Sequence, residues 1–202
     1  MGKVRLLISL LMLTAGLTGC GGLRQFMGFE DGDPQVENGD RMGTQVLNTT
    51  DNITTLSNAT AGIEVTLPSS WQSDNRLHPS AELQASDPEN RLYLVVVAEE
   101  EAALNRFGIK ENAETYRALL IGKLNRLDSQ TATDVAFVGE DFATQYEIRG
   151  LLAPESPVVY LHTTVLTENR YYQVVGWTTP DQYQFYKTEL QTITESFRET
   201  LE

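Results

Sequence analysis

The chain has 202 residues, one cysteine and a formal net charge of −13, with 28 acidic residues against 15 basic ones. This acidic balance argues against nucleic-acid binding, which needs a basic face, and against electrostatic attachment to anionic lipid. A single cysteine excludes a disulfide within the chain, so the fold must draw its stability from a hydrophobic core.

The N-terminus has the three parts of a secretory signal. Lys3 and Arg5 supply positive charge, residues 6–15 are mostly apolar, and small residues follow them. Ten helical residues rise only ~15 Å, about half of the hydrocarbon core of a bilayer, so this run is too short to span a membrane. We therefore expect residues 1–19 to be a signal peptide.

The stretch Leu17-Thr18-Gly19-Cys20 resembles the lipobox of bacterial lipoproteins. The resemblance implies cleavage between Gly19 and Cys20 and acylation of Cys20 with chains such as palmitate. Two or three acyl chains make a lasting anchor, whereas one chain holds a protein only reversibly. Removal of residues 1–19 takes away two basic residues and no acid, so the net charge moves from −13 to −15. An ordinary signal peptide with a stray buried cysteine is the alternative.

The lipobox resemblance also implies a location. The expected protein is anchored in a bacterial membrane by its acylated Cys20 and faces the periplasm. Gly21 after the cysteine, in place of Asp, is similar to the pattern of outer-membrane routing in enterobacteria. If the host is a cyanobacterium, the thylakoid lumen is the competing location.

Residues 21–60 are rich in Gly, Asn, Asp and Thr and show no sustained apolar period. Runs such as Asp31-Gly32-Asp33-Pro34 are typical of turns and coil. We predict a flexible tether over residues 20–60, which would span on the order of 35 Å as a random coil. A single folded domain is expected over residues 61–202.

The domain opens with strand patterns. Residues 63–67 alternate apolar and polar side chains and stop at Pro68, which indicates a half-buried strand. Residues 81–85 alternate again, and a turn at 87–90 leads into the apolar run 91–98. That run predicts an interior strand covered on both faces, paired with the preceding strand as a hairpin.

The apolar period then changes to that of a helix. Apolar residues recur every three or four positions along 113–127, with Asn112 as the expected N-cap. Four strands rich in Val, Tyr, Thr and Phe follow, joined by short turns, which favours an antiparallel meander. Their expected ranges are 133–138, 142–150, 158–166 and 170–177.

The last element has the clearest signal. Thr179 is the expected N-cap, Pro180 takes the first helical position, and Gln182 follows three residues after the cap. Apolar residues then step by three and four along one face as far as Phe197. The fold class expected is α+β, with about seven strands in an antiparallel sheet flanked by two helices.

The strand end Leu67-Pro68-x-x-Trp71, the order of elements and the helix end Ser196-Phe197 resemble PsbP-like domains. That family includes the extrinsic protein of photosystem II and its lipoprotein relatives. The resemblance covers most of residues 61–200 and implies an α/β/α sandwich that acts as a non-catalytic accessory factor at a membrane. Some relatives bind metal through His and carboxylate groups, but no matching cluster is found, so we expect no metal and no other cofactor.

Candidate catalytic groups are few. The two histidines, His78 and His162, are expected to be a solvent-facing loop residue and a hydrogen-bonded sheet residue. Cys20 carries lipid in this interpretation, and neither a Gly-x-Ser-x-Gly motif nor a phosphate-binding glycine loop occurs. Acids are plentiful, so spacing alone leaves a glycosidase-like carboxylate pair open. We expect no catalytic residues, and a hydrolase of cell-wall or polysaccharide material is the alternative.

Aromatic residues gather near the C-terminus. Tyr171, Tyr172 and Trp177 belong to the last long strand, with Tyr171 and Trp177 on one face and Tyr172 on the other, while Phe185 lies off the apolar stripe of the last helix. They either fill a covered sheet or form an exposed patch for a protein partner of unknown identity. The leading hypothesis is a lipid-anchored accessory module that binds a membrane or envelope complex. A carrier of a small apolar ligand is a third possibility.

Overall fold

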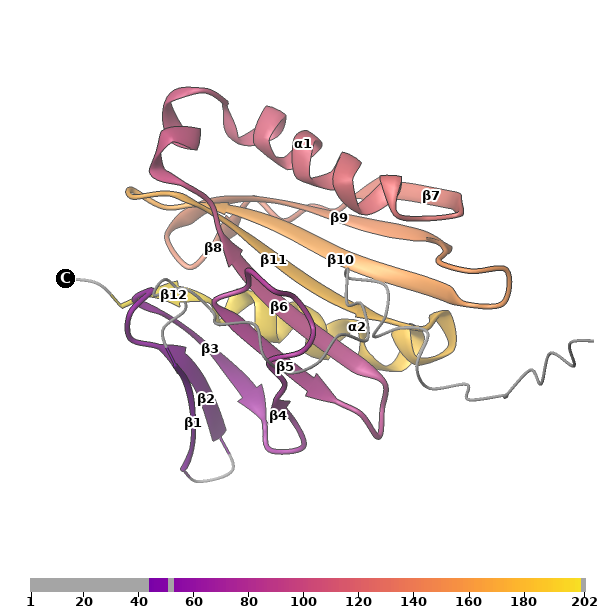
Figure 1. Ribbon diagram of the computed structural model, residues 1–202, viewed down its shortest axis with the longest axis horizontal. Coiled ribbons are helices and arrows are strands. Elements are labelled where there is room, and N and C mark those ends of the chain that lie inside the picture. The colour runs from indigo at the N-terminus through magenta and orange to yellow at the C-terminus, as the bar shows by residue number, and fades with distance from the viewer. Residues whose placement is uncertain (1–43, 51–52, 201–202) are drawn as a thin grey trace, which may run out of the picture.

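Two antiparallel sheets, two α-helices and a short 3-10 helix (Glu101–Asn105) make up residues 44–50 and 53–200, the part of the chain that a computed structural model describes. Figure 1 shows helix α1 (Ile109–Gly122) lying across one face of the larger sheet. Helix α2 (Pro180–Glu195) and the smaller sheet cover the opposite face. The α+β class with antiparallel strands between two helices is confirmed.

The larger sheet has eight strands. Their order is β4-β5-β6-β11-β10-β9-β7, and β8 pairs with β9. Their bounds are β4 Gln72–Ser73, β5 Leu83–Asp87, β6 Leu92–Ala98, β7 Arg126–Ala132, β8 Phe137–Val138, β9 Asp141–Leu151, β10 Pro157–Leu166 and β11 Tyr171–Thr178. Strands β9, β10 and β11 form the predicted meander, and α1 carries the chain from β6 in the middle of the sheet to β7 at its edge.

The smaller sheet corrects the predicted domain boundary. Its four strands are β1 (Gln45–Thr50), β2 (Ile53–Asn58), β3 (Ile63–Pro68) and β12 (Arg198–Glu199). Leu56 is fully buried, and the Asn58 side chain donates a hydrogen bond to the Glu82 carbonyl at 3.0 Å. The prediction of a flexible tether is therefore wrong for residues 45–50 and 53–58, where Thr favours strands despite a composition typical of coil. The expected signal peptide, Gly19 and Cys20 lie outside the described residues.

The hydrophobic core is divided between the two faces of the larger sheet. On β11, Tyr172 and Val174 join the cluster under α2, whereas Val175 and Trp177 join the cluster under α1, as strand alternation requires. Strand β6 is buried on both faces along most of its length, as predicted. Helix α2 and the smaller sheet therefore cover one face of the larger sheet, and α1 covers the other together with residues of the loop 74–82.

Both helices begin after a residue with extended backbone, and neither N-cap side chain makes a capping hydrogen bond. Helix α2 starts after Thr179 with Pro180 at its first position, as predicted. Helix α1 starts earlier than predicted, after Gly108, so Asn112 lies buried inside its first turn and is not the N-cap. It also ends earlier, because the Asn125 N–H donates to the Leu151 carbonyl and starts the β7–β9 pairing.

The strand expected at 133–138 is in fact the short β8, preceded by β7. Within the described residues, no helix is long and apolar enough to cross a membrane.

The β7–β9 pairing gives a test of the fold at Gly150. A Cβ at Gly150 would overlap the backbone carbonyl oxygen of Arg126 and lie 2.8 Å from Leu124 Cδ1. We expect Gly150→Ala to lower the free energy of unfolding by roughly 1–3 kcal/mol, because backbone must move to admit the methyl group. Urea denaturation followed by circular dichroism measures this.

The control is Gly122→Ala at the end of α1, where an added Cβ meets nothing within 4 Å. Alanine is the better helix former, so this variant should be unchanged or more stable by up to ~1 kcal/mol. Equal unfolding midpoints for the two alanine variants would contradict the predicted packing of β7 on Gly150.

Candidate binding groove

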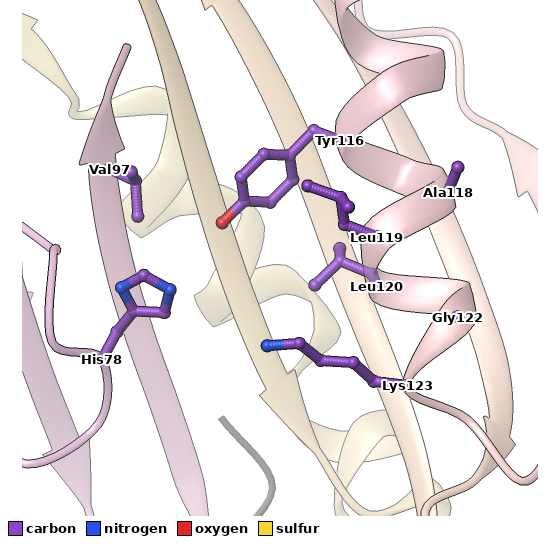
Figure 2. A pocket seen from close by; sticks show the side chains of 8 residues that line it. All are labelled: His78, Val97, Tyr116, Ala118, Leu119, Leu120, Gly122 and Lys123. Carbon is purple, nitrogen blue, oxygen red and sulfur yellow. The ribbon is translucent and has the colours of Figure 1, made fainter. Parts of the chain in front are cut away.

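A groove of about 520 Å³ opens between α1 and the loop 74–82. Figure 2 shows Tyr116 and Lys123 reaching from α1 toward the space that His78 enters from the loop on the other side. Its volume falls in the range of roughly 300–1,000 Å³ that is typical of small-molecule sites. The lining residues are His78, Val97, Tyr116, Ala118, Leu119, Leu120, Gly122 and Lys123.

The groove exists because two separate segments cover one face of the larger sheet. Helix α1 contacts β9 and β10, at one side of this face. Over the rest of the face, the loop 74–82 contributes Leu77 and Ala81 to the same buried cluster that includes Leu120 of α1. The space between the two covers is walled mainly by apolar side chains, among them Val97 of β6 and the 60% exposed Leu119.

A buried glutamine fixes the loop wall. Gln84 is 3% exposed, and its side-chain oxygen accepts hydrogen bonds from the backbone N–H groups of Leu77 and His78 at 2.9 and 2.8 Å. Its amide nitrogen donates to the His78 carbonyl at 2.8 Å. Because these bonds hold the backbone on both sides of His78, the loop presents this imidazole to the groove in a defined position.

The hydrogen bonds of His78 also assign its proton. The Ser80 backbone N–H donates to His78 Nδ1 at 3.2 Å, so in the neutral ring the proton is on Nε2. Burial, and then the charge of Lys123, lower the pKa of His78. His78 lies in a loop, as expected, but its ring is half-buried rather than fully solvent-facing. At neutral pH this side chain is a neutral hydrogen-bond donor through Nε2.

The wall formed by α1 is held by a buried polar network centred on Gln173. Its amide nitrogen donates to Glu99 Oε1 at 2.6 Å and to Asn112 Oδ1 at 2.7 Å. Asn112 in turn donates to Glu99 Oε2 at 2.7 Å. The Gln173 oxygen accepts a hydrogen bond from Thr164 at 2.7 Å and lies 2.8 Å from His162 Nε2. One side chain thus links β11, β10, the end of β6 and the first turn of α1.

His162 is the hydrogen-bonded sheet histidine that the sequence predicts. It is fully buried, and because the Gln173 oxygen can only accept, the proton is on His162 Nε2. His162 Nδ1 is buried without a hydrogen-bond partner among the described residues. Burial lowers the pKa of His162 to about 4, with the charge of Arg117 acting in the same direction and the bond to Gln173 opposing it.

Tyr116 joins the buried network to the groove. Its ring stacks on the imidazole of His162 with ring centroids 5.3 Å apart, and the same side chain lines the groove. Burial, followed by the carboxylates of Glu99 and Glu82, raises the pKa of Tyr116 to about 12. The hydroxyl therefore stays protonated at neutral pH and is able to donate a hydrogen bond.

The opposite face of the sheet has a charged cluster around Glu147. Tyr183 and Lys187 bond to Glu147 Oε2 at 2.8 and 3.2 Å, and Arg149 bonds to Oε1 at 2.7 Å. Burial acts to raise the pKa of Glu147, but the hydrogen bonds from Tyr183, Arg149 and Lys187 outweigh it and the pKa is lowered. Residues of α2 and β9 donate hydrogen bonds to both oxygens of this carboxylate, so the cluster holds α2 against β9.

The structure separates the four aromatic residues proposed as a partner surface. Tyr171, Tyr172 and Trp177 are only 2%, 0% and 1% exposed, so they fill the two faces of a covered sheet. Phe185 is 74% exposed on α2. The four do not form one patch, and an exposed surface built from the three strand residues is wrong because both faces of β11 are covered. Their sequence pattern is that of any fully buried strand.

The described residues offer limited material for catalysis. Within them, no group of three or more His, Cys, Asp or Glu side chains is arranged to hold a metal ion. The hydroxyl of Thr164 lies 3.3 Å from His162 Nε2, but both residues are fully buried and out of reach of a substrate. The lining residues of the groove include neither an acid nor a serine. No specific observation favours the hydrolase alternative.

Comparisons with known proteins establish the fold. No protein-family model and no curated protein matches the chain. Among solved structures it is similar to the cyanobacterial PsbP (CyanoP) of Synechocystis sp. PCC 6803, with a TM-score of 0.55 and 15% identity over 75% of this chain and 94% of that one. The domain has a PsbP-like fold. It also aligns with PA94 of Pseudomonas aeruginosa, a protein of unknown function described as a putative regulator, with a TM-score of 0.42 and 9% identity over 76% and 96%. That second likeness is too low to carry an argument.

The buried imidazole predicts a pH-dependent stability. The pKa of His162 is about 4 in the folded chain against 6.5 for the free side chain. As the pH falls from 6.5 toward 4, the unfolded chain therefore binds a proton that the folded chain does not, and the free energy of unfolding should decrease by roughly 3 kcal/mol. Urea denaturation at pH 7, 5.5 and 4 measures this change.

The matched variant is His162→Gln, which places an amide N–H near the position of Nε2 and cannot titrate. It should be less stable than wild type at pH 7, yet lose less stability on acidification, by about the same 3 kcal/mol. Carboxylates titrate in both proteins and cancel in the comparison. An identical pH dependence in the two proteins would show that His162 is not the responsible group.

Proposed function

We propose that this chain is a lipid-anchored, extracytoplasmic accessory protein that serves a membrane or envelope complex and binds through the groove between α1 and the loop 74–82. The groove is the structural feature that supports a binding role. It combines apolar walls with donors from His78, Tyr116 and Lys123. The backbone of His78 is held by Gln84, and the ring of Tyr116 is stacked on His162. Convergent polar groups in an apolar pocket are the usual form of a binding site.

The PsbP-like fold supports an accessory role. The sequence resemblance to PsbP-like domains implies a non-catalytic factor at a membrane, and the fold of the described residues agrees with that family's architecture. The proposal does not depend on any transferred catalytic or metal-binding residue. It takes from the family only the class of function, and the binding surface comes from this chain.

The proposed location of the protein depends on Cys20. A domain with a net charge of −15 after cleavage has no electrostatic attraction to anionic lipid, so acyl chains on Cys20 would be its main attachment. The periplasmic side of a bacterial membrane is the proposed location, with the outer membrane favoured and the thylakoid lumen as the alternative in a cyanobacterial host.

The anchor is tested by metabolic labelling with palmitate. Wild-type protein should incorporate label and sediment with membranes, and Cys20→Ala should lose both properties, because the thiol is the site of acylation. Equal labelling of the two proteins would contradict the lipoprotein assignment.

The binding role is tested by crosslinking in native membranes. We expect wild-type protein to crosslink to specific envelope proteins, and Leu119→Glu to lose those products by placing a negative charge on the groove wall. Leu119 is 60% exposed, so this change should leave folding intact.

The matched control is Phe185→Glu, which places the same charge on the exposed part of α2 on the opposite face. It should retain the crosslinked products. Loss in both variants, or in Phe185→Glu alone, would move the partner surface away from the groove and overturn its proposed role.

A further inference from the structure

We propose that the occupant of the groove is a small monocarboxylate with an apolar body, of the chemical class of a medium-chain fatty acid. This inference rests on the proposed binding role of the groove and adds the ligand class: the small molecule lies inside the groove, while the envelope protein contacts its exposed wall at Leu119. It follows from three features of the lining residues, namely their charge, their hydrogen-bond donors and their apolar walls.

The lining residues of the groove carry one positive charge, that of Lys123, and no negative charge, although the protein is acidic. Lys123 makes no ion pair or side-chain hydrogen bond among the described residues, whereas Lys187 on the other face is paired with Glu147. None of the eight lining residues is acidic, although the chain has 28 acids. A single uncompensated ammonium favours an anion with one charge, since a dianion would remain half-neutralised.

The polar atoms of the groove are arranged as donors. His78 presents Nε2–H, because its Nδ1 accepts the Ser80 N–H, and Lys123 presents an ammonium from the facing helix. Tyr116 brings a protonated hydroxyl between them (Figure 2). A carboxylate accepts hydrogen bonds at both oxygens, so it can be held by two such donors at once.

The walls fit an apolar body. Val97, Leu119 and Leu120 line the groove beside the donors, and burial of apolar ligand surface contributes ~25 cal/mol per Å². A volume of about 520 Å³ between α1 and the loop suits a small molecule with a short apolar chain. The carboxylate would sit between Lys123 and His78, with its apolar chain along α1.

The test is isothermal titration calorimetry of decanoate into the whole mature chain, residues 20–202, carrying Cys20→Ala so that no acyl group enters the sample. Saturable binding is expected, and Lys123→Met should weaken it by about 10- to 100-fold, the range for loss of a charged hydrogen bond. Lys110→Met is the matched control, because Lys110 is exposed on the same helix and does not line the groove. It should leave the affinity unchanged.

Leu119→Glu gives a second, independent readout, since a carboxylate on the wall should repel decanoate without disturbing the core. Decanol, which has the chain without the charge, should bind at least tenfold more weakly than decanoate. Absence of saturable decanoate binding, equal affinity for decanol, or equal effects of Lys123→Met and Lys110→Met would each overturn the ligand class.

The outcomes separate this inference from the proposed function. If decanoate fails to bind while Leu119→Glu still removes the crosslinked envelope proteins, the groove is a binding site for another occupant and only the ligand class is wrong. If decanoate binds as expected while no palmitate is incorporated at Cys20, the ligand class holds and the proposed anchor is wrong.

Discussion

The side-chain amide of Gln173 determines where α1 lies, and the groove depends on that position. The apolar contact of α1 with the sheet is limited, since Ala113 and Leu120 are its buried apolar residues and Tyr116 and Ile121 are only partly buried. A small apolar contact would leave the helix free to slide. The bonds from Gln173 to Asn112 and Glu99 remove that freedom, because any shift of the helix would leave buried polar atoms unsatisfied.

A second glutamine does the same for the other wall. Gln84 bonds to the backbone around His78, as Gln173 bonds to the first turn of α1, so each wall of the groove is fixed by one buried amide from a strand of the sheet. Neither wall is a continuation of the other, and Val97 of β6 is the residue of the sheet that lines the groove with them. The groove therefore results from two independent attachments to a rigid floor, which favours a site that is formed before its ligand arrives.

The sequence predicts best those elements whose signals are local. Helix α2 has a cap, a proline and a regular apolar period, and strands β9 to β11 are separated by clear turns, so their bounds agree with expectation to within a few residues. The hairpin of β1 and β2 was missed because Thr and Asn are common to strands and coil, and only the tertiary burial of Leu56 distinguishes them. The site was missed for a related reason. Gln84 and Gln173 give one weak signal, a polar residue at an inward position of an apolar strand, and nothing in the sequence indicates what each amide would bond.

The acidity of the chain limits how the groove can recognise an anion. At physiological ionic strength charges are screened beyond about 8 Å, so the net charge of −13 neither attracts nor strongly repels a ligand at a distance. Most other basic side chains that the structure describes form ion pairs, as with Arg91 on Asp181 and Arg198 on Glu64. The uncompensated ammonium of Lys123 acts only on a group that has already entered the groove. Affinity must then come mainly from apolar burial, with the charge selecting which end of the ligand lies between α1 and the loop. A ligand that is mostly apolar and carries one anionic end satisfies both conditions.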